Sequence, residues 1–205
     1  QLQVLVPALA TTADVKVSNV AFTNYAYGQW PDAVYRGVTL SFTASKATST
    51  LRFNDLSLEN VNNESWGLDN VSVTQGKSAV FSDNFESGAS KQWSEARVDT
   101  AASSVFSAYS GRFASEEQRL TLNGLTAGQT YTLTFDLYAL DSWDGSTAPN
   151  YGPDRFQVSA DGKVLMDESI SSWVTTPQTI NNSAGVRLQV VPTLSGMNLS
   201  YGRPG

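Results

Sequence analysis

The sequence predicts an all-β protein, and three observations indicate this fold class. Threonine, serine, valine, asparagine and aromatic residues are abundant, strong helix formers are few, and the chain contains 15 glycines. Short runs alternate between apolar and polar residues, as expected for strands with one buried face. No segment shows the period of an amphipathic helix. We therefore expect antiparallel sheets that pack around a shared apolar core.

Predicted strands follow one another through the first half of the chain. Residues 1–12 form an extended apolar segment, and residues 14–25 alternate between apolar and polar side chains. Residues 38–43 form a clear period-two strand, and residues 51–54 begin another after a turn. A polar loop then leads to the apolar face of residues 68–73.

The second half of the chain continues the pattern. Residues 81–86 and 131–140 are predicted strands, and the second of these is the strongest in the sequence. Residues 155–159 and 164–170 flank the dipeptide Asp161-Gly162, which is typical of a two-residue hairpin turn. This half is therefore expected to contain at least one tight antiparallel hairpin.

Composition excludes several classes of function. The net charge of −6 argues against binding to nucleic acid, because no basic patch could neutralise phosphates. Cysteine and histidine are absent, which removes thiolate nucleophiles, Ser-His-Asp triads and most transition-metal sites. No apolar run is long enough to span a membrane. We expect a protein that is not an enzyme, although carboxylates alone can support glycoside hydrolysis.

Three short motifs carry a family resemblance. They are Asn-Phe-Glu at 84–86, Asp-Ser-Trp-Asp-Gly at 141–145 and Trp-Gly-Leu-Asp-Asn-Val at 66–71. These motifs resemble those of jelly-roll β-sandwich modules in extracellular carbohydrate-binding modules and in repeats of bacterial surface and adhesin proteins. The resemblance implies an antiparallel jelly-roll sandwich in a secreted or cell-surface protein, but it is poorly specific for function.

The order of these motifs differs from that of the modules they resemble. There, the Asn-Phe-Glu strand opens the fold and the Trp-Gly-Leu-Asp-Asn-Val strand closes it. Here the closing part, at 14–74, precedes the opening part, at 81–172. We favour one circularly permuted domain over 13–173, with strand-like extensions at 1–12 and 174–205. The alternative is the tail of one module followed by the head of the next.

The resemblance also implies a structural calcium ion. In such modules an acidic residue of the opening strand and an aspartate of the closing strand often share the ion. By position these are Glu86 and Asp69, with Asp83 as a third ligand. The alternative is that Asp69 and Asn70 only form a turn through side-chain hydrogen bonds to the backbone.

The loops that hold two tryptophans are candidate ligand sites. Trp66 and Trp143 could stack on a sugar, with Asp141 and Asp144 as polar partners. The same residues could instead pack these loops, and Glu64 with an aspartate could form a glycosidase pair. We expect a second group of aromatic residues to be exposed: Tyr25, Tyr27, Trp30 and Tyr35. This group could form a sugar platform, an interface or an ordinary sandwich edge.

The apolar start of the chain suggests assembly. Leu2, Val4, Leu5 and Val6 are too apolar to remain in water, yet they lie outside the module pattern. We therefore expect an extracellular structural or adhesive subunit that polymerises with copies of itself by β-strand donation. The alternative is a calcium-dependent carbohydrate-binding module with glycan partners.

Overall fold

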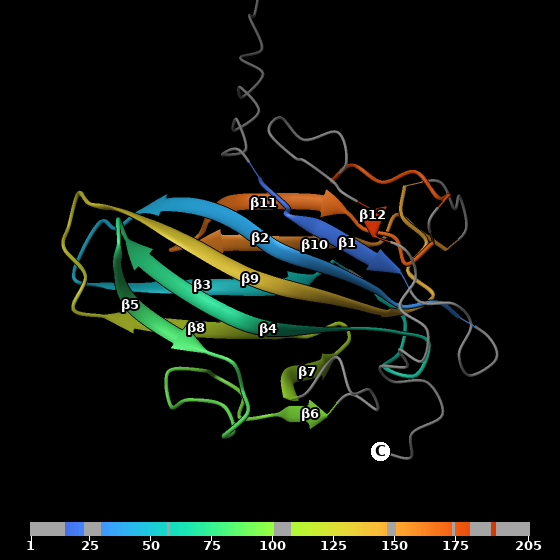
Figure 1. Ribbon diagram of the computed structural model, residues 1–205, viewed down its shortest axis with the longest axis horizontal. Helices are drawn as coiled ribbons and strands as arrows, with labels where there is room; N and C mark the ends of the chain where they lie inside the picture. The colour runs from blue at the N-terminus through green and yellow to red at the C-terminus, as the bar shows by residue number, and fades with distance from the viewer. Residues whose placement is uncertain are drawn as a thin grey trace, which may run out of the picture.

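The computed structural model describes residues 15–22, 30–56, 58–100, 108–146, 151–173, 175–180 and 190–191. Within these residues every regular element is a β-strand, which confirms the predicted all-β class (Figure 1). The strands in chain order are β1 (Asn19–Phe22), β2 (Ala33–Thr43), β3 (Thr48–Asp55), β4 (Glu64–Gln75), β5 (Ser78–Asp83), β6 (Val98–Thr100), β7 (Ala108–Phe113), β8 (Glu117–Asn123), β9 (Thr130–Asp141), β10 (Arg155–Ala160), β11 (Lys163–Ser169) and β12 (Val190–Val191).

The strands form two sheets that pack face to face. The larger sheet has the order β12-β1-β2-β9-β4-β7-β6, and β5 also pairs with β4. The smaller sheet has the order β11-β10-β3-β8 and lies behind the larger one in Figure 1. All strand pairs are antiparallel except the short β1–β12 pair. The described residues therefore form a β-sandwich.

Strands from the two halves of the chain are interleaved within both sheets. In the larger sheet β9, from the second half, lies between β2 and β4 from the first half. In the smaller sheet β3 lies between β10 and β8. The closing and opening segments also meet directly, because β4, which holds the closing motif, pairs antiparallel with β5 through a turn at Gly76 and Lys77. The predicted strand at 81–86 ends at Asp83, and the Asn-Phe-Glu motif follows it outside the strand. The two halves of the chain thus build one sandwich together.

The core lies between the inner faces of the sheets. Along β9, the side chains of Leu133, Phe135 and Leu137 are buried, and Leu51 and Phe53 face them from β3. The rings of Phe53 and Phe135 meet edge to face, with centroids 5.4 Å apart. Burial of these alternating positions explains why the period-two pattern located the strands from sequence.

The predicted hairpin turn is confirmed. β10 and β11 pair antiparallel across Asp161 and Gly162, which have φ angles of 49° and 84°. Positive φ at both central residues is typical of a type I′ turn, whose twist matches that of the flanking strands. The strand β2 is longer than the predicted strand at 38–43, because it begins at Ala33, which pairs with Ala139. The strand β9 agrees with the predicted strand at 131–140 to within one residue at each end.

The structure describes residues 15–22 of the first predicted strand of the domain. Of these, Asn19–Phe22 form β1, and Lys16 forms an isolated bridge to Thr39. Val15 and Val17 are nevertheless buried, so the predicted apolar face exists before the strand begins.

The two terminal extensions fall mostly outside the described residues. The whole of 1–12 lies outside the described residues. Of the C-terminal extension at 174–205, the structure describes residues 175–180 and the short strand β12.

A glycine in the Trp-Gly-Leu-Asp-Asn-Val motif lets an aromatic ring approach the backbone of β4. Trp66 and Leu68 belong to the core, so Gly67 between them faces the opposite side of the sheet. The ring of Tyr109 lies against this position, and a Cβ atom on Gly67 would come within 2.5 Å of it. The closing motif therefore requires glycine here for packing.

Candidate metal centre

Three carboxylates converge at one end of the sandwich. Glu64, Asp144 and Asp154 each offer an oxygen, and these oxygens lie within 4.8 Å of one another. β4 and β10 begin at this end, and β9 finishes there, on the right in Figure 1. We call this group the carboxylate cluster.

The backbone explains why these three residues meet. Glu64 is the first residue of β4 and lies opposite Asp141, the last residue of β9. Asp144 follows in the next loop, and its backbone N–H donates to the carboxylate of Asp154. The backbone N–H of Asp154 in turn donates to the carbonyl of Gly145 at 3.1 Å. Strand ends that are far apart in sequence thus hold the cluster.

The cluster brings three acidic side chains together where Glu64 and Asp154 are buried and Asp144 is partly buried. None of the ion pairs among the described residues includes any of its members. Burial, followed by repulsion from Asp154, raises the pKa of Glu64 from 4.5 to about 8. Burial likewise raises the pKa of Asp154 from 3.8 to about 7 and also raises that of Asp144. A bound cation would remove the mutual repulsion, and carboxylate oxygens are ligands that calcium prefers.

These raised pKa values predict a stability that falls with pH when no metal is bound. Between pH 4.5 and 8 the folded protein holds a proton on Glu64 that the unfolded chain has lost. We therefore expect the free energy of unfolding to decrease by roughly 1–3 kcal/mol across this range. Urea unfolding in chelator at several pH values measures this. Glu64→Gln, which cannot titrate, should flatten the curve; an equally steep curve in that variant would assign the slope to other groups.

The calcium ligands predicted from the family resemblance are separate from this cluster. Asp83 uses its carboxylate to hold its own loop: one oxygen accepts the backbone N–H of Phe85 at 2.9 Å. The other accepts the N–H of Ser90 at 2.9 Å and the indole N–H of Trp93 at 3.0 Å. Asp83 thus fixes the turn that follows β5.

Asp69 and Glu86 also have protein partners. The carboxylate of Asp69 accepts the hydroxyl of Tyr138 at 2.9 Å and the backbone N–H of Asn70 at 2.6 Å. Glu86 accepts the backbone N–H of Ala108 at 3.2 Å. Among the described residues, the carboxylates that converge are those of the cluster, and Asp69, Asp83 and Glu86 do not form such a group.

The two tryptophans predicted as ligand contacts are buried packing residues. The indole N–H of Trp66 donates to the carboxylate of Asp55 at 2.8 Å, and that of Trp143 donates to the carbonyl of Ser65 at 2.8 Å. Both side chains have 0% exposure, so neither ring presents a face to a sugar. Asp141 is buried as well, and its backbone N–H donates to the carboxylate of Asp32. Of the four predicted ligand residues, only Asp144 joins the cluster.

Sequence reasoning missed Asp154 and considered Glu64 only as part of a catalytic pair. Both residues stand at the start of a strand, Glu64 in β4 and Asp154 immediately before β10. Acidic residues at the starts of strands indicate a shared carboxylate site when those strands begin at the same end of the sandwich, and this is known only once the strand order is known. Sequence alone does not give that order.

The exposed aromatic residues differ from the predicted platform. Tyr35 is buried, and its hydroxyl donates to the carbonyl of Ser171 at 2.6 Å, so its predicted exposure is wrong. Trp30 is 37% exposed and packs edge to face on Trp173, with centroids 6.0 Å apart. Tyr151, in the loop that leads to Asp154, is 67% exposed. Tyr25 and Tyr27 lie outside the described residues.

Comparison with known proteins gives no family assignment. No protein-family model, no curated protein and no solved structure matches this chain. In the part of the chain that the structure describes, no helix is long and apolar enough to cross a membrane. The sequence predicts that the N-terminal apolar residues drive assembly, and these residues lie outside the described part of the chain: Leu2, Val4, Leu5 and Val6. Function is therefore inferred from the geometry of the chain itself.

Proposed function

We propose that the protein is a non-enzymatic, extracellular structural or adhesive subunit whose sandwich is stabilised by a calcium ion at the carboxylate cluster. The observation that carries the metal proposal is the convergence of Glu64, Asp144 and Asp154 within 4.8 Å. Two of these side chains are almost fully buried, and their raised pKa values record the cost of keeping them charged without a cation. Backbone carbonyls and water would complete the six to eight oxygen ligands of calcium.

Burial of the carboxylates supports a structural role. A retaining glycosidase holds its two carboxyl groups about 5–5.5 Å apart on either side of a sugar bond, in an open cleft. Glu64 has 2% exposure and Asp141 has none, so neither faces a site where a substrate would sit. The absence of histidine and cysteine removes other common acids, bases and nucleophiles.

The finer fold assignment is part of this proposal. We infer a circularly permuted jelly roll over 13–173 because β4, which carries the closing motif, forms a hairpin with β5, and the opening motif at 84–86 follows β5 directly. Interleaving of strands from both halves within each sheet favours one domain over parts of two modules.

Calcium titration tests the proposed function. A ligand that binds only the folded state stabilises it by about 2.7 kcal/mol at roughly 100 times its Kd. We expect calcium to raise the melting temperature by several degrees and chelator to reverse the change. Glu64→Gln and Asp144→Asn should abolish this response.

Two variants separate the possible sites. Glu95→Gln removes an exposed carboxylate outside the cluster and should leave the calcium response unchanged. Asp69→Asn tests the site implied by the family resemblance. If Asp69→Asn alone removes the response, calcium binds there; an identical melting curve in calcium and in chelator would contradict the metal proposal.

Calcium-dependent carbohydrate binding is a second candidate. It is favoured by Tyr151, which is 67% exposed in the loop that ends at Asp154 of the cluster. A calcium ion at the cluster would be held by Asp154 at the end of this loop, and the exposed ring could stack on a sugar beside it. A glycan array with and without calcium tests this, and Tyr151→Ala should remove any binding while leaving the calcium response intact.

We also propose that the partner of the subunit is another copy of the same chain. The support is the apolar segment Leu2–Val6 together with unpaired strand edges in the described sandwich. Analytical ultracentrifugation over a range of concentrations and negative-stain electron microscopy test this assembly.

A further inference from the structure

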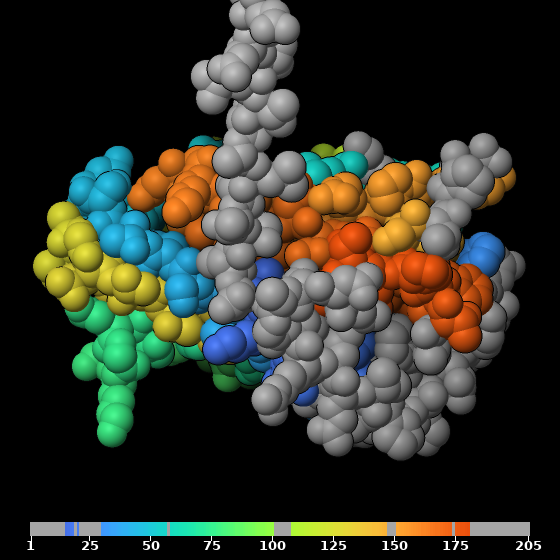
Figure 2. Space-filling model, turned by 90° about the horizontal axis from the view of Figure 1, so that it is seen from above, coloured from blue at the N-terminus to red at the C-terminus, as the bar shows by residue number. Residues whose placement is uncertain are grey.

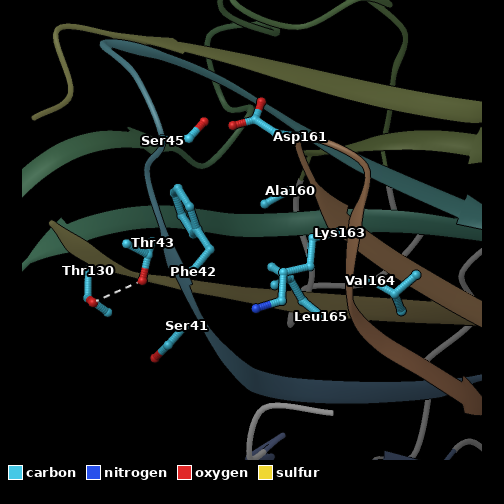
Figure 3. Close-up of a pocket in the computed structure, with 10 residues that line it drawn as sticks. All are labelled: Ser41, Phe42, Thr43, Ser45, Thr130, Ala160, Asp161, Lys163, Val164 and Leu165. Carbon is cyan, nitrogen blue, oxygen red and sulfur yellow. Dashed lines mark hydrogen bonds between the residues drawn. The ribbon is translucent and has the colours of Figure 1, made fainter. Parts of the chain in front are cut away.

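The sandwich is open along one side, where the end of β2 faces β11 of the smaller sheet. A groove of about 310 Å³ lies between them (Figure 3). The buried side chains of Phe42, Ala160 and Leu165 contribute its apolar lining, and exposed polar residues such as Thr43 and Lys163 form its rim. An apolar floor with a polar rim is the usual character of a site that binds a peptide segment.

One wall of the groove is the end of β2, along an edge that no strand of the described residues pairs with beyond Thr39. Thr39 of β2 exchanges two backbone hydrogen bonds with Lys16, at 2.7 and 3.2 Å. Since alternate residues of a strand direct their N–H and C=O groups to the same edge, those of Ser41 and Thr43 point to this edge too. Beyond Thr39 no described strand pairs with it. Figure 2 looks onto this side, with the β10–β11 hairpin in orange beside the end of β2 in light blue.

The opposite wall is a poorer template for pairing. In the β10–β11 ladder, Val158 lies opposite Met166 and Ser159 lies opposite Val164, so Leu165 is an extra residue. Such a bulge bends an edge strand and blunts it against further pairing. An added strand would therefore pair with β2 and lay its side chains over Leu165.

The segment that precedes Lys16 in the same chain is a poor filler of this groove. Lys16 lies opposite Thr39, and the same register would place Ala13 opposite Phe42. Continued further, it would carry residues 2–6 past the end of β2. In that register, the segment before Lys16 would place only the methyl group of Ala13 in the groove.

We propose that this groove accepts residues 2–6 of a second copy as an added strand on β2. This inference rests on the proposed self-assembly and names its acceptor. Leu2, Val4 and Val6 alternate, so all three face the groove floor when Gln3 and Leu5 face outward. The side chains of residues 1–10 carry no charge that would conflict with the rim. Because donor and acceptor are different surfaces, the contact repeats head to tail and builds a filament.

The absence of native cysteine allows a direct test by cross-linking. Full-length Gln3→Cys protein is mixed with full-length Thr43→Cys protein under mild oxidation. In a register that places Gln3 beside Thr43, both side chains face outward at a separation that a disulfide can bridge. Glu95→Cys, an exposed position away from the groove, replaces Thr43→Cys in the control. We expect about tenfold more cross-linked heterodimer than in the control, because docking raises the local thiol concentration.

A second pair of variants tests the edge itself. Ser41→Pro removes the N–H that points to the free edge, whereas Ser41→Ala keeps it. In sedimentation experiments, Ser41→Ala should still form polymers and Ser41→Pro should not. Both variants should give the same circular dichroism spectrum, which shows that the fold is retained.

The outcomes separate the acceptor from the assembly. Polymers without excess cross-linking to Thr43→Cys would overturn this groove as the acceptor and leave self-assembly standing. A monomer at all concentrations, with no cross-link, would overturn both. A disulfide formed only within a chain that carries both Gln3→Cys and Thr43→Cys would show that the segment folds back, and would also overturn the proposal.

Discussion

Replacing Trp66 with alanine is expected to lower the free energy of unfolding by about 3–5 kcal/mol. The ring is fully buried and packs against Phe113 and Phe156, with centroids 4.7 and 5.0 Å away. Its removal leaves a large cavity between the sheets, and the carboxylate of Asp55 loses the indole N–H. Chemical unfolding monitored by circular dichroism measures the loss. Trp30→Ala, which removes a partly exposed ring, should cost within about 1 kcal/mol.

The milder variant Trp66→Phe separates the packing of the ring from its hydrogen bond to Asp55. It keeps an aromatic ring in the core but leaves Asp55 without its indole donor, so we expect a loss of about 1–3 kcal/mol. If Trp66→Ala unfolds at the same denaturant concentration as the unchanged protein, the structural role of Trp66 is wrong. Unchanged stability with lost glycan binding would instead return Trp66 to the list of ligand residues.

Replacing Gly67 with alanine is expected to lower the free energy of unfolding clearly, although the change adds only one methyl group. The added Cβ would lie 2.5 Å from the ring of Tyr109 and 3.1 Å from the carbonyl oxygen of Ser110. A ring that is itself fully buried cannot move away freely, so β4 and β7 must separate. Overpacking of this kind costs about 1–3 kcal/mol, and thermal and urea unfolding measure it.

A double-mutant cycle identifies the cause. If the clash with Tyr109 is responsible, Gly67→Ala should cost much less in a Tyr109→Ala background, with a coupling of about 1–3 kcal/mol. Ser72→Ala, at a half-buried position of the same strand, serves as the control for introducing alanine into β4. Full additivity of Gly67→Ala and Tyr109→Ala would contradict the steric explanation.

Local patterns were sufficient to find most strands. Alternation located β3, β9 and β10, because one face of each strand is buried in the core. Asp161-Gly162 located a turn, because its geometry needs two residues that tolerate positive φ. These signals depend on neighbours along the chain, so a sequence displays them directly.

The candidate site depends on contacts that a sequence does not display. Glu64 and Asp154 meet only because β4, β9 and β10 share one end of the sandwich. Tyr35 was expected to be exposed, but its hydroxyl is held by Ser171, far away in sequence. Likewise, Asp83 was expected to bind metal, whereas it caps its own loop. Polar residues reveal their partners only once the strand order is fixed.

The interleaving of strands has a consequence for how the chain folds. Leu51 of β3 pairs with Leu120 on one side and with Ala160 on the other, so the smaller sheet cannot form until most of the chain is synthesised. Closing such large loops before any contact is gained places the protein among slow folders, on the order of milliseconds to seconds. Only hairpins such as β10–β11 can form early. Cutting the chain between β4 and β5 is therefore expected to yield two fragments that fold only in each other's presence.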